Sequence, residues 1–412
     1  MPEKSAGASW ARRFFSLELL DNRYPQLHGL RVLAIVSVVQ FHITTIFALE
    51  QAIRLDRDWV GSSLAIFFGM DLFFILSGFL IGSILLHSLK QQALAREKGD
   101  KPRGLGPIAR FYLRRIFRTF PPYYVVLTVL ALLYSPLTHA QKHHLPYEYA
   151  YLTNFFPLAR HEVIMFWGWS LALEEQFYLV VPLLFFLLGR LRTDRARLVL
   201  LAVLWACGTL SRLGIYYWHL WQKGPWDDVE LYGAIYFRTY TRFDTLVMGI
   251  ILAVLHDRFR EPIGRWLSLP LHRALLAMPS LLCLWLLLRP WTFVSKSMQQ
   301  FHVFAWGTLT TLMYLGFLIL LLHGEGLIHR FVSAPIFRRL ATLGYGIYLV
   351  HIPLCDYVVV PLAHKLDARH VSLLVIWPLS LALLLALSMS VAYAMHVLIE
   401  KPALRLRDRI AG

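Results

Sequence analysis

Residues 30–42 read LRVLAIVSVVQFH, an apolar run that contains one arginine, Arg31, and one histidine, His42. The two are eleven residues apart, close to three helical turns, so a helix places them on one face, roughly 16 Å apart along its axis. Ionisable side chains within a membrane span are costly and usually line a cavity or a reaction path. A cation near the helix end and an imidazole deeper in the span suit an enzyme that binds an anionic carrier at the membrane surface and works on the carrier's far end.

The rest of the chain has the composition of an integral membrane protein. Its 412 residues are 57% hydrophobic and 14% aromatic, and the mean hydropathy is +0.53. Several apolar runs exceed the 18 or so residues that mark a membrane span. The net charge of +16 does not imply nucleic acid as a partner, because basic residues collect in the cytoplasmic loops of multispan proteins. We expect an all-α protein embedded in a lipid bilayer.

About ten transmembrane helices are predicted, since lipid-exposed backbone must satisfy its own hydrogen bonds. The predicted segments are 28–49, 60–89, 119–140, 170–189, 198–218, 243–257, 274–290, 303–322, 343–362 and 371–399. If the N-terminus is cytoplasmic, the inside segments hold 28 Lys and Arg residues and the outside segments hold 11. This bias places both termini in the cytoplasm.

The predicted organisation is a cytoplasmic N-terminal segment (1–27), a multispan membrane domain (28–399) and a cytoplasmic tail (400–412). The polar stretch 90–107 contains glycine and proline and is long for a connection between helices. We expect it to form a mobile cytoplasmic loop.

Two ionisable residues in the first two spans are candidates for proton transfer. A neutral imidazole at His42 can take a proton from an acceptor hydroxyl as a general base. Asp71 lies deep in the second span and needs a partner. It either fixes the tautomer of His42, or pairs with a hydroxyl or with a cation of another helix. The neighbouring Ser77-Gly78 pair indicates close helix packing rather than a serine nucleophile.

Arginines gather where the third span begins, in the sequence RFYLRRIFRTFPP at 110–122. Arg114 and Arg118 share a helix face, as do Arg115 and Arg118. Their guanidinium groups match phosphate oxygens bidentately. Anchoring to lipid headgroups is the alternative, and Arg31 at the same membrane face favours phosphate binding.

The fourth span begins from the outside with WGWSLALEEQFY at 167–178. Glu174 and Glu175 point in different directions on a helix, so we expect one of them to face a cavity. That carboxylate could hold an acceptor hydroxyl or act as an acid or base. The alternative is that both complement the helix dipole beside an interfacial tryptophan belt.

The remaining polar and aromatic side chains give no specific indication of function. Arg238, Arg242 and Asp244 could form a local ion pair, and His351 is expected to pack within its span. The outer aromatic residues fit an interfacial belt better than a sugar platform. Three histidines have faint metal spacing, at positions 139, 143 and 144, but we expect no metal site. The three cysteines are expected in the core, without disulfides.

Together these segments resemble the membrane-bound acyltransferase family 3, which includes O-acetyltransferases of cell-surface glycans. The family's Arg/Lys-x10-His motif matches Arg31 and His42. Its aspartate-to-Ser-Gly-Phe segment matches 71–79, its Arg-x-x-Arg motif matches 115–118, and its Trp-Ser-Leu-x-x-Glu-Glu-Gln-Phe segment matches 169–177. The aspartate-glycine pair that usually opens the family's first helix is replaced here by His-Gly.

The resemblance implies transfer of an acyl group, in the first place acetyl, from cytoplasmic acyl-CoA to a hydroxyl of a carbohydrate or lipid-linked glycan. It implies a multi-pass protein of the bacterial inner membrane. The expected catalytic residues are His42, Asp71, Glu174 and Glu175, and the expected acyl-CoA-binding residues are Arg31, Arg114, Arg115 and Arg118. The rival function is a proton-coupled transporter in which His42 and Asp71 relay protons.

Overall fold

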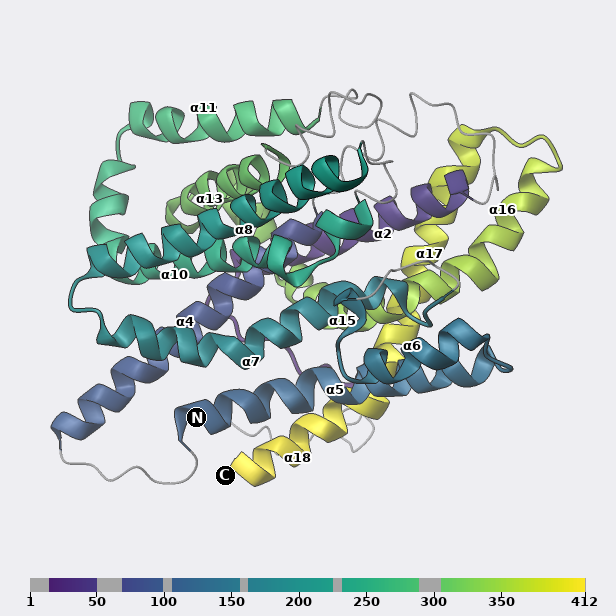
Figure 1. The fold of residues 1–412 in the computed structure, drawn as a ribbon, viewed down its shortest axis with the longest axis horizontal. Helices are drawn as coiled ribbons and strands as arrows, with labels where there is room; N and C mark the ends of the chain where they lie inside the picture. The colour runs from purple at the N-terminus through teal and green to yellow at the C-terminus, as the bar shows by residue number, and fades with distance from the viewer. Residues whose placement is uncertain are drawn as a thin grey trace. The chain divides into compact units, whose positions relative to one another are not determined.

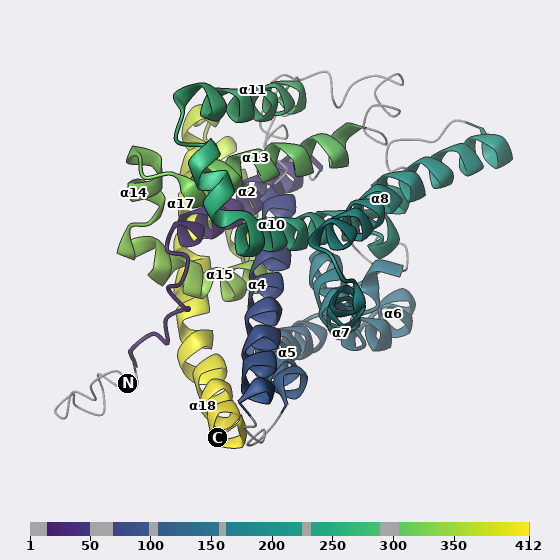
Figure 2. The same cartoon turned by 90° about the vertical axis from the view of Figure 1, so that its left-hand side faces the viewer.

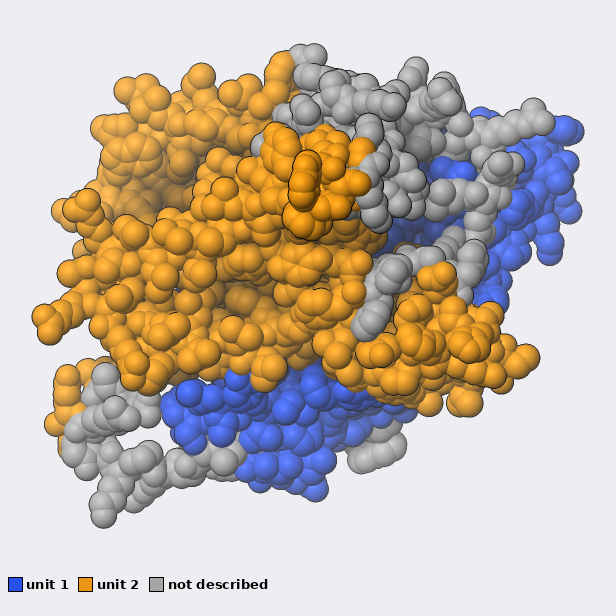
Figure 3. Space-filling view, viewed as in Figure 1, with its two compact units in different colours: residues 1–54, 104–126, 330–412 blue, residues 55–103, 127–329 orange. Residues whose placement is uncertain are grey.

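The computed structural model describes residues 15–49, 69–98, 106–155, 162–224, 232–288 and 305–411. In these ranges every regular element is a helix, which confirms the all-α class (Figure 1). The chain divides into two compact units, which Figure 3 shows in different colours. Unit 1 contains residues 1–54, 104–126 and 330–412, and unit 2 contains residues 55–103 and 127–329.

Unit 1 is built from helices of both ends of the chain. Helix α2 packs against α15, and α15 packs against α17. A π-helical turn, η7, continues α17 into α18. Figure 2 labels both helices, which are drawn in yellow at the C-terminal end of the chain. The helices are α2 (Gln26–Leu49), most of α5 (Pro107–Leu133), α15 (Pro335–Leu354), η6 (Cys355–Val359), α16 (Val360–Asp367), α17 (Leu373–Met395), η7 (His396–Glu400) and α18 (Lys401–Ala411).

Unit 2 is centred on α10, which packs against α4, α7, α8 and α13, while α11 packs against α13. Its long helices are α4 (Gly69–Glu97), α7 (Trp169–Arg190), α8 (Asp194–Lys223), α10 (Thr239–Trp266), α11 (Pro270–Leu287) and α13 (Gly307–His323). Its short helices are α6 (His139–Tyr149), η1 (Thr153–Phe155), η2 (Phe166–Gly168) and η3 (Tyr232–Tyr236). Helix α14 (Leu327–Val332) lies at the boundary of the two units in the sequence.

Eight described helices are long and apolar enough to cross a membrane, so the chain is a multi-pass membrane protein. They are Gln26–Ala48, Gly69–Gln91, Pro107–Leu133, Phe166–Arg190, Asp194–Gln222, Pro270–Leu287, Pro335–Asp367 and Leu373–Ile410. Two of the ten predicted segments fall in helices outside this group. Helix α13 has only 17 residues, and α10 carries charged side chains such as Asp244 and Asp257. The orientation of the termini stays a prediction.

Some boundaries differ from the predicted ones. Helix α4 continues to Glu97, so the start of the segment predicted as a loop is helical. A leucine- and alanine-containing run continues the helix there, because both residue types favour a helix. Residues 60–68 of the predicted second span lie outside the described residues. Cys283 and Cys355 are buried as expected, whereas Cys207 is exposed on α8.

Two glycines let α4 and α10 approach closely within unit 2. A Cβ atom on Gly78 would overlap the main-chain carbonyl of Leu246, and one on Gly249 would overlap that of Ile75. The Cα of Gly78 also lies 2.8 Å from the Cβ position that a side chain at Gly249 would take. The close packing predicted for Ser77-Gly78 is therefore present, and it fixes where the side chains of α4 meet those of α10.

The segment before α2, which we call the N-terminal strap (residues 15–20), is held through its main chain. Side chains of α15, α17, η7 and α18 bind its backbone atoms. The bonds are Arg338 Nε to the Leu20 carbonyl (2.7 Å), Tyr393 Oη to the Phe15 carbonyl (2.7 Å), the Glu18 amide to His396 Nε2 (3.1 Å) and Lys401 Nζ to the Ser16 carbonyl (2.7 Å). The strap thus connects the start of the chain to the C-terminal helices of unit 1.

Candidate functional site

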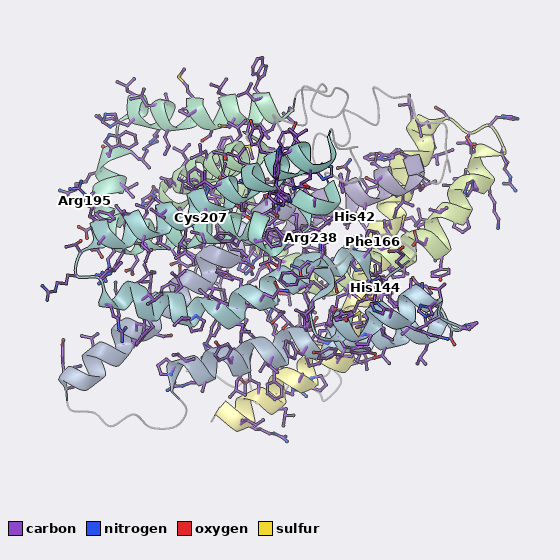
Figure 4. All side chains as sticks on the ribbon, viewed as in Figure 1. His42, His144, Phe166, Arg195, Cys207 and Arg238 are labelled. Carbon is purple, nitrogen blue, oxygen red and sulfur yellow. The ribbon has the colours of Figure 1, made fainter. Side chains whose placement is uncertain are left out.

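The predicted face of α2 is directed into the protein. Ile35 and Val38, which lie between Arg31 and His42 on this face, are each only 3% exposed, whereas Leu33 on another face is 56% exposed. Arg31 and His42 are half-buried. Because α2 is continuous from Gln26 to Leu49, the spacing of about three turns holds, and Figure 4 shows His42 on this helix.

His42 contacts a second histidine, for which the sequence predicts packing within its span. The Nδ1 atom of His42 lies 2.8 Å from Nε2 of His351 on α15. The ring centroids are 5.0 Å apart. On its other side, Nδ1 of His351 lies 2.7 Å from the carbonyl oxygen of Tyr348. His351 is buried within its span, as expected, and its side chain is also a hydrogen-bonding partner of the candidate base.

The arginines of α5 differ in exposure. Arg115 and Arg118 are half-buried, whereas Arg114 is exposed. The guanidinium carbon of Arg115 lies 6.0 Å from the centroid of the Phe111 ring. Residues three apart share a helix face, so Arg115 and Arg118 form the more enclosed part of the predicted phosphate site, and Arg114 lies at its edge.

A hydrogen bond ties this part of α5 to the helix that carries His351. Tyr345 on α15 donates from its hydroxyl to the carbonyl oxygen of Thr119, at 2.9 Å. Pro121 and Pro122 follow inside the helix. Because proline has no N–H group, the carbonyl groups four residues before each of them receive no helical hydrogen bond from these positions. Within unit 1, α15 therefore contacts both the helix of the imidazole and the helix of the arginines.

In unit 2, Asp71 pairs with a cation of another helix. Its Oδ1 atom accepts a hydrogen bond from Arg242 Nη2 at 2.8 Å, and both side chains are almost completely buried. The Arg242 guanidinium also lies 4.3 Å from the ring centroid of Trp306 and 4.7 Å from that of Tyr236. This arrangement is the second alternative given for Asp71. Its direct role at His42 stays a prediction.

A second buried ion pair replaces the local pair predicted around Asp244. Arg212 Nη2 of α8 lies 2.8 Å from Asp244 Oδ2 of α10. Two glycines make room for it, because a side chain at Gly208 would collide with Asp244, and one at Gly307 would collide with Arg212. Arg242 and Asp244 thus bind different helices. Sequence spacing alone could not reveal partners 171 positions away, as for Arg242 and Asp71.

Glu174 joins α7 to α4. Ser77 donates from its hydroxyl to Glu174 Oε1 at 2.6 Å, and Tyr178 donates to Glu174 Oε2 at 3.3 Å. All three side chains lie in unit 2, and both Glu174 and Ser77 remain partly exposed. In this position the Glu174 carboxylate accepts hydrogen bonds from hydroxyl groups. Glu175, the next residue, is also partly exposed.

The residue after these glutamates fixes the N-terminal part of α7. Gln176 donates to the Tyr151 carbonyl at 2.7 Å and to Asn154 Oδ1 at 2.9 Å. Its own oxygen accepts from the Thr239 hydroxyl at 2.6 Å. Asn154 and Thr239 also bond to each other. The network ties three segments of unit 2 together beside Glu174 and Glu175.

A buried carboxyl group was not singled out from the sequence. Glu148 on α6 is completely buried and accepts hydrogen bonds from the amides of Ile164 and Met165, both at 2.8 Å. Burial raises the pKa of Glu148 from 4.5 to about 7, against the opposing effect of the two amide bonds and of His144. Through its two hydrogen bonds to the amides of Ile164 and Met165, Glu148 holds the chain before α7 in place.

No metal site is found among the described residues, since no three His, Cys, Asp or Glu side chains lie close enough to hold an ion. His144, labelled in Figure 4, instead contacts the Glu162 carbonyl through Nδ1 at 3.0 Å. His143 stacks edge-on with His144. Trp218 and Trp221, two of the aromatic residues predicted to lie on the outer side, are exposed, which fits an interfacial belt.

Comparison with known proteins gives a consistent result. The model of the acyltransferase domain family, Acyl_transf_3, matches residues 24–397. The peptidoglycan O-acetyltransferase OatA of Listeria monocytogenes is 29% identical over 350 residues, which cover 80% of this chain and 49% of OatA. YrhL of Bacillus subtilis, provisionally named a peptidoglycan O-acetyltransferase, is 27% identical over 349 residues, 81% of this chain and 49% of its own.

A Staphylococcus aureus (strain COL) protein, provisionally named an O-acetyltransferase, is 30% identical over 248 residues, which cover 57% of this chain and 35% of that protein. The chain thus spans about half the length, or less, of these curated relatives. Among solved structures, none matches the chain.

Proposed function

The chain belongs to the acyltransferase family whose model covers residues 24–397, and on this premise we propose that it transfers an acyl group, in the first place acetyl, to a hydroxyl of a cell-surface glycan or glycolipid. The donor in this proposal is acyl-CoA from the cytoplasm, and the protein lies in the bacterial inner membrane. The relatives named as peptidoglycan O-acetyltransferases support a glycan acceptor.

The observation that carries the proposal is the position of His42. It lies on a buried face of a continuous membrane helix, about three turns from Arg31. An imidazole in this position can accept the proton of an acceptor hydroxyl while the oxygen attacks the acyl carbonyl. The extended arm of an acyl carrier could reach it, so the charged part of the donor would stay at the membrane surface.

The donor phosphates are assigned to arginines of unit 1. Arg31, Arg115 and Arg118 are half-buried, which allows bidentate bonds to phosphate oxygens with less competition from water than at a fully exposed site. Arg114 is exposed and is proposed to contribute long-range attraction.

The acceptor is assigned to carboxylates of unit 2. Glu174 already accepts hydrogen bonds from two hydroxyl groups, those of Ser77 and Tyr178. A sugar hydroxyl could replace one of them. Glu175 is the second candidate for this role. Asp71 is buried and paired with Arg242. We therefore assign this pair to holding α4 and α10 together, and not to direct contact with the substrate.

Mass spectrometry of surface glycans tests the activity. We expect glycans from cells that carry the gene to contain acyl groups that are missing when the gene is deleted, and to regain them when the wild-type gene is restored. A His42→Ala gene should fail to restore them. Unchanged acylation in the deletion strain, together with proton-coupled uptake of a solute by the purified protein, would instead support the transporter.

A further inference from the structure

Two hydrogen bonds in series determine which nitrogen of His42 can act as a base. The first joins Nδ1 of His42 to Nε2 of His351, at 2.8 Å. The second joins Nδ1 of His351 to the carbonyl oxygen of Tyr348, at 2.7 Å. His351 is completely buried. His42, His351 and the Tyr348 carbonyl therefore form a chain of hydrogen bonds that ends at the backbone of α15.

The donor and acceptor roles in this chain of hydrogen bonds follow from the Tyr348 carbonyl group, which can only accept a hydrogen bond. Nδ1 of His351 therefore carries a proton. In a neutral imidazole the other nitrogen is then an acceptor, and neutral rings are the form that an apolar helix interior favours. Nε2 of His351 thus accepts from Nδ1–H of His42. By the same reasoning, Nε2 of His42 lacks a proton and carries the lone pair of the ring.

We propose that His351 is the positioning residue of the acyl transfer, holding His42 in the tautomer whose Nε2 acts as the base. This inference rests on the proposed function. His351 itself touches neither substrate nor reacting atoms. It fills the role that a carboxylate fills in a serine hydrolase triad, and the Tyr348 carbonyl orients it.

In the proposed step His42 moves one proton from the acceptor hydroxyl to the leaving thiolate. The acceptor hydroxyl gives its proton to Nε2 of His42 while its oxygen forms a bond to the acyl carbonyl carbon. The bond from that carbon to the sulfur of coenzyme A then breaks, and the thiolate takes the proton from Nε2. During this step the bond from His42 Nδ1–H to His351 becomes charge-assisted and so stabilises the imidazolium. His351 keeps its own proton throughout.

Two replacements of similar size separate positioning from packing. In His351→Gln an amide oxygen can still accept from Nδ1 of His42, whereas in His351→Leu no acceptor remains. We expect His351→Leu to lower kcat about 10- to 100-fold, the usual effect of losing such a supporting partner, with little change in KM for the acyl donor. His351→Gln should recover about half of that loss on a logarithmic scale. His364→Gln, on an exposed position of α16, is the matched control and should behave as wild type.

Nitrogen NMR of histidine-labelled protein gives a second readout that needs no activity. The wild-type spectrum should show His42, assigned by its loss in His42→Ala, with a protonated Nδ1 and an unprotonated Nε2. His351→Leu should convert this signal to a mixture of tautomers, and His351→Gln should preserve it.

The outcomes are distinct for the two proposals. Full activity in His42→Ala would overturn the role of His42 and thus the proposed mechanism. If His42→Ala is inactive while His351→Leu keeps wild-type kcat, or if the tautomer of His42 is the same in His351→Leu, the positioning role of His351 is wrong. Equal losses in His351→Gln and His351→Leu with an unchanged tautomer would assign His351 to packing alone.

Discussion

Single residues of this protein show how ionisable groups are accommodated among membrane helices. Asp71 and Arg242 bind each other at 2.8 Å, and Arg242 also lies against two aromatic rings. An isolated charge in such a place would be costly, and a hydrogen-bonded opposite charge offsets most of that cost. Loss of either side chain would therefore leave the other as a buried charge without its partner.

Removing one member should harm the protein more than removing both. We expect Asp71→Leu to lower the free energy of unfolding by about 3–5 kcal/mol, because it leaves Arg242 buried without its carboxylate. The double variant Asp71→Leu, Arg242→Met should recover much of this loss. Unfolding in mixed detergent micelles measures both effects, and additive losses would show that the two side chains act independently.

The arginines of α5 are predicted to bind phosphate by geometry as well as charge. Arg115→Ala and Arg118→Ala should each weaken acyl-CoA binding, and lysine should restore binding only in part because it lacks the bidentate fork. Arg110→Ala, an exposed position on the same helix, serves as the control in equilibrium binding measurements. Equal effects at all three positions would indicate a general attraction between opposite charges.

Glu148 predicts a pH dependence of stability. Its pKa is raised from 4.5 to about 7 in the folded protein, so between these values the folded chain keeps a proton that the unfolded chain has lost. Stability from this group is therefore present at low pH and falls as the pH rises to about 7. Relative to Glu148→Gln, the wild-type melting temperature should fall across that window. A constant difference between the two proteins would contradict the assignment.

At the scale of helices, packing in unit 2 depends on the contact of α4 with α10. Gly78→Leu should prevent this contact, because even a Cβ atom at position 78 would overlap the Leu246 carbonyl. We expect poor yield of folded protein and loss of activity, measured by gel filtration in detergent and by acyl transfer. Gly189→Leu is the matched control, since the space around Gly189 is open. Normal behaviour of Gly78→Leu would mean that the helices can separate without consequence.

Hydropathy predicted most helices because each span is long and apolar in itself. The same information placed Arg31 and His42 on one face, since their spacing is local. The partner of His42 could not be found in this way, because His351 is 309 positions away and contact depends on tertiary packing. One signal was available: His351 also lies in an apolar run, and the demand for a partner that was applied to Asp71 applies equally to it.

At the scale of the whole molecule, the candidate residues fall into two compact units. Unit 1 contains His42, His351 and the candidate phosphate-binding arginines of α2 and α5, and unit 2 contains Asp71 and the two glutamates. The proposed function thus divides into donor binding and proton transfer on one unit and acceptor binding on the other. The family match covers parts of both units, from residue 24 to residue 397.

The most direct test of acyl transfer uses the purified chain in lipid nanodiscs with labelled acetyl-CoA and an extracted glycan acceptor. Wild-type protein should release coenzyme A and form a labelled acyl ester on the glycan. His42→Ala should lower the rate of transfer by about 10²–10⁴-fold, the usual contribution of a general base, while acetyl-CoA binding and His364→Ala stay normal. Wild-type rates in a folded His42→Ala protein, or no transfer by the wild type to any extracted glycan, would contradict the account.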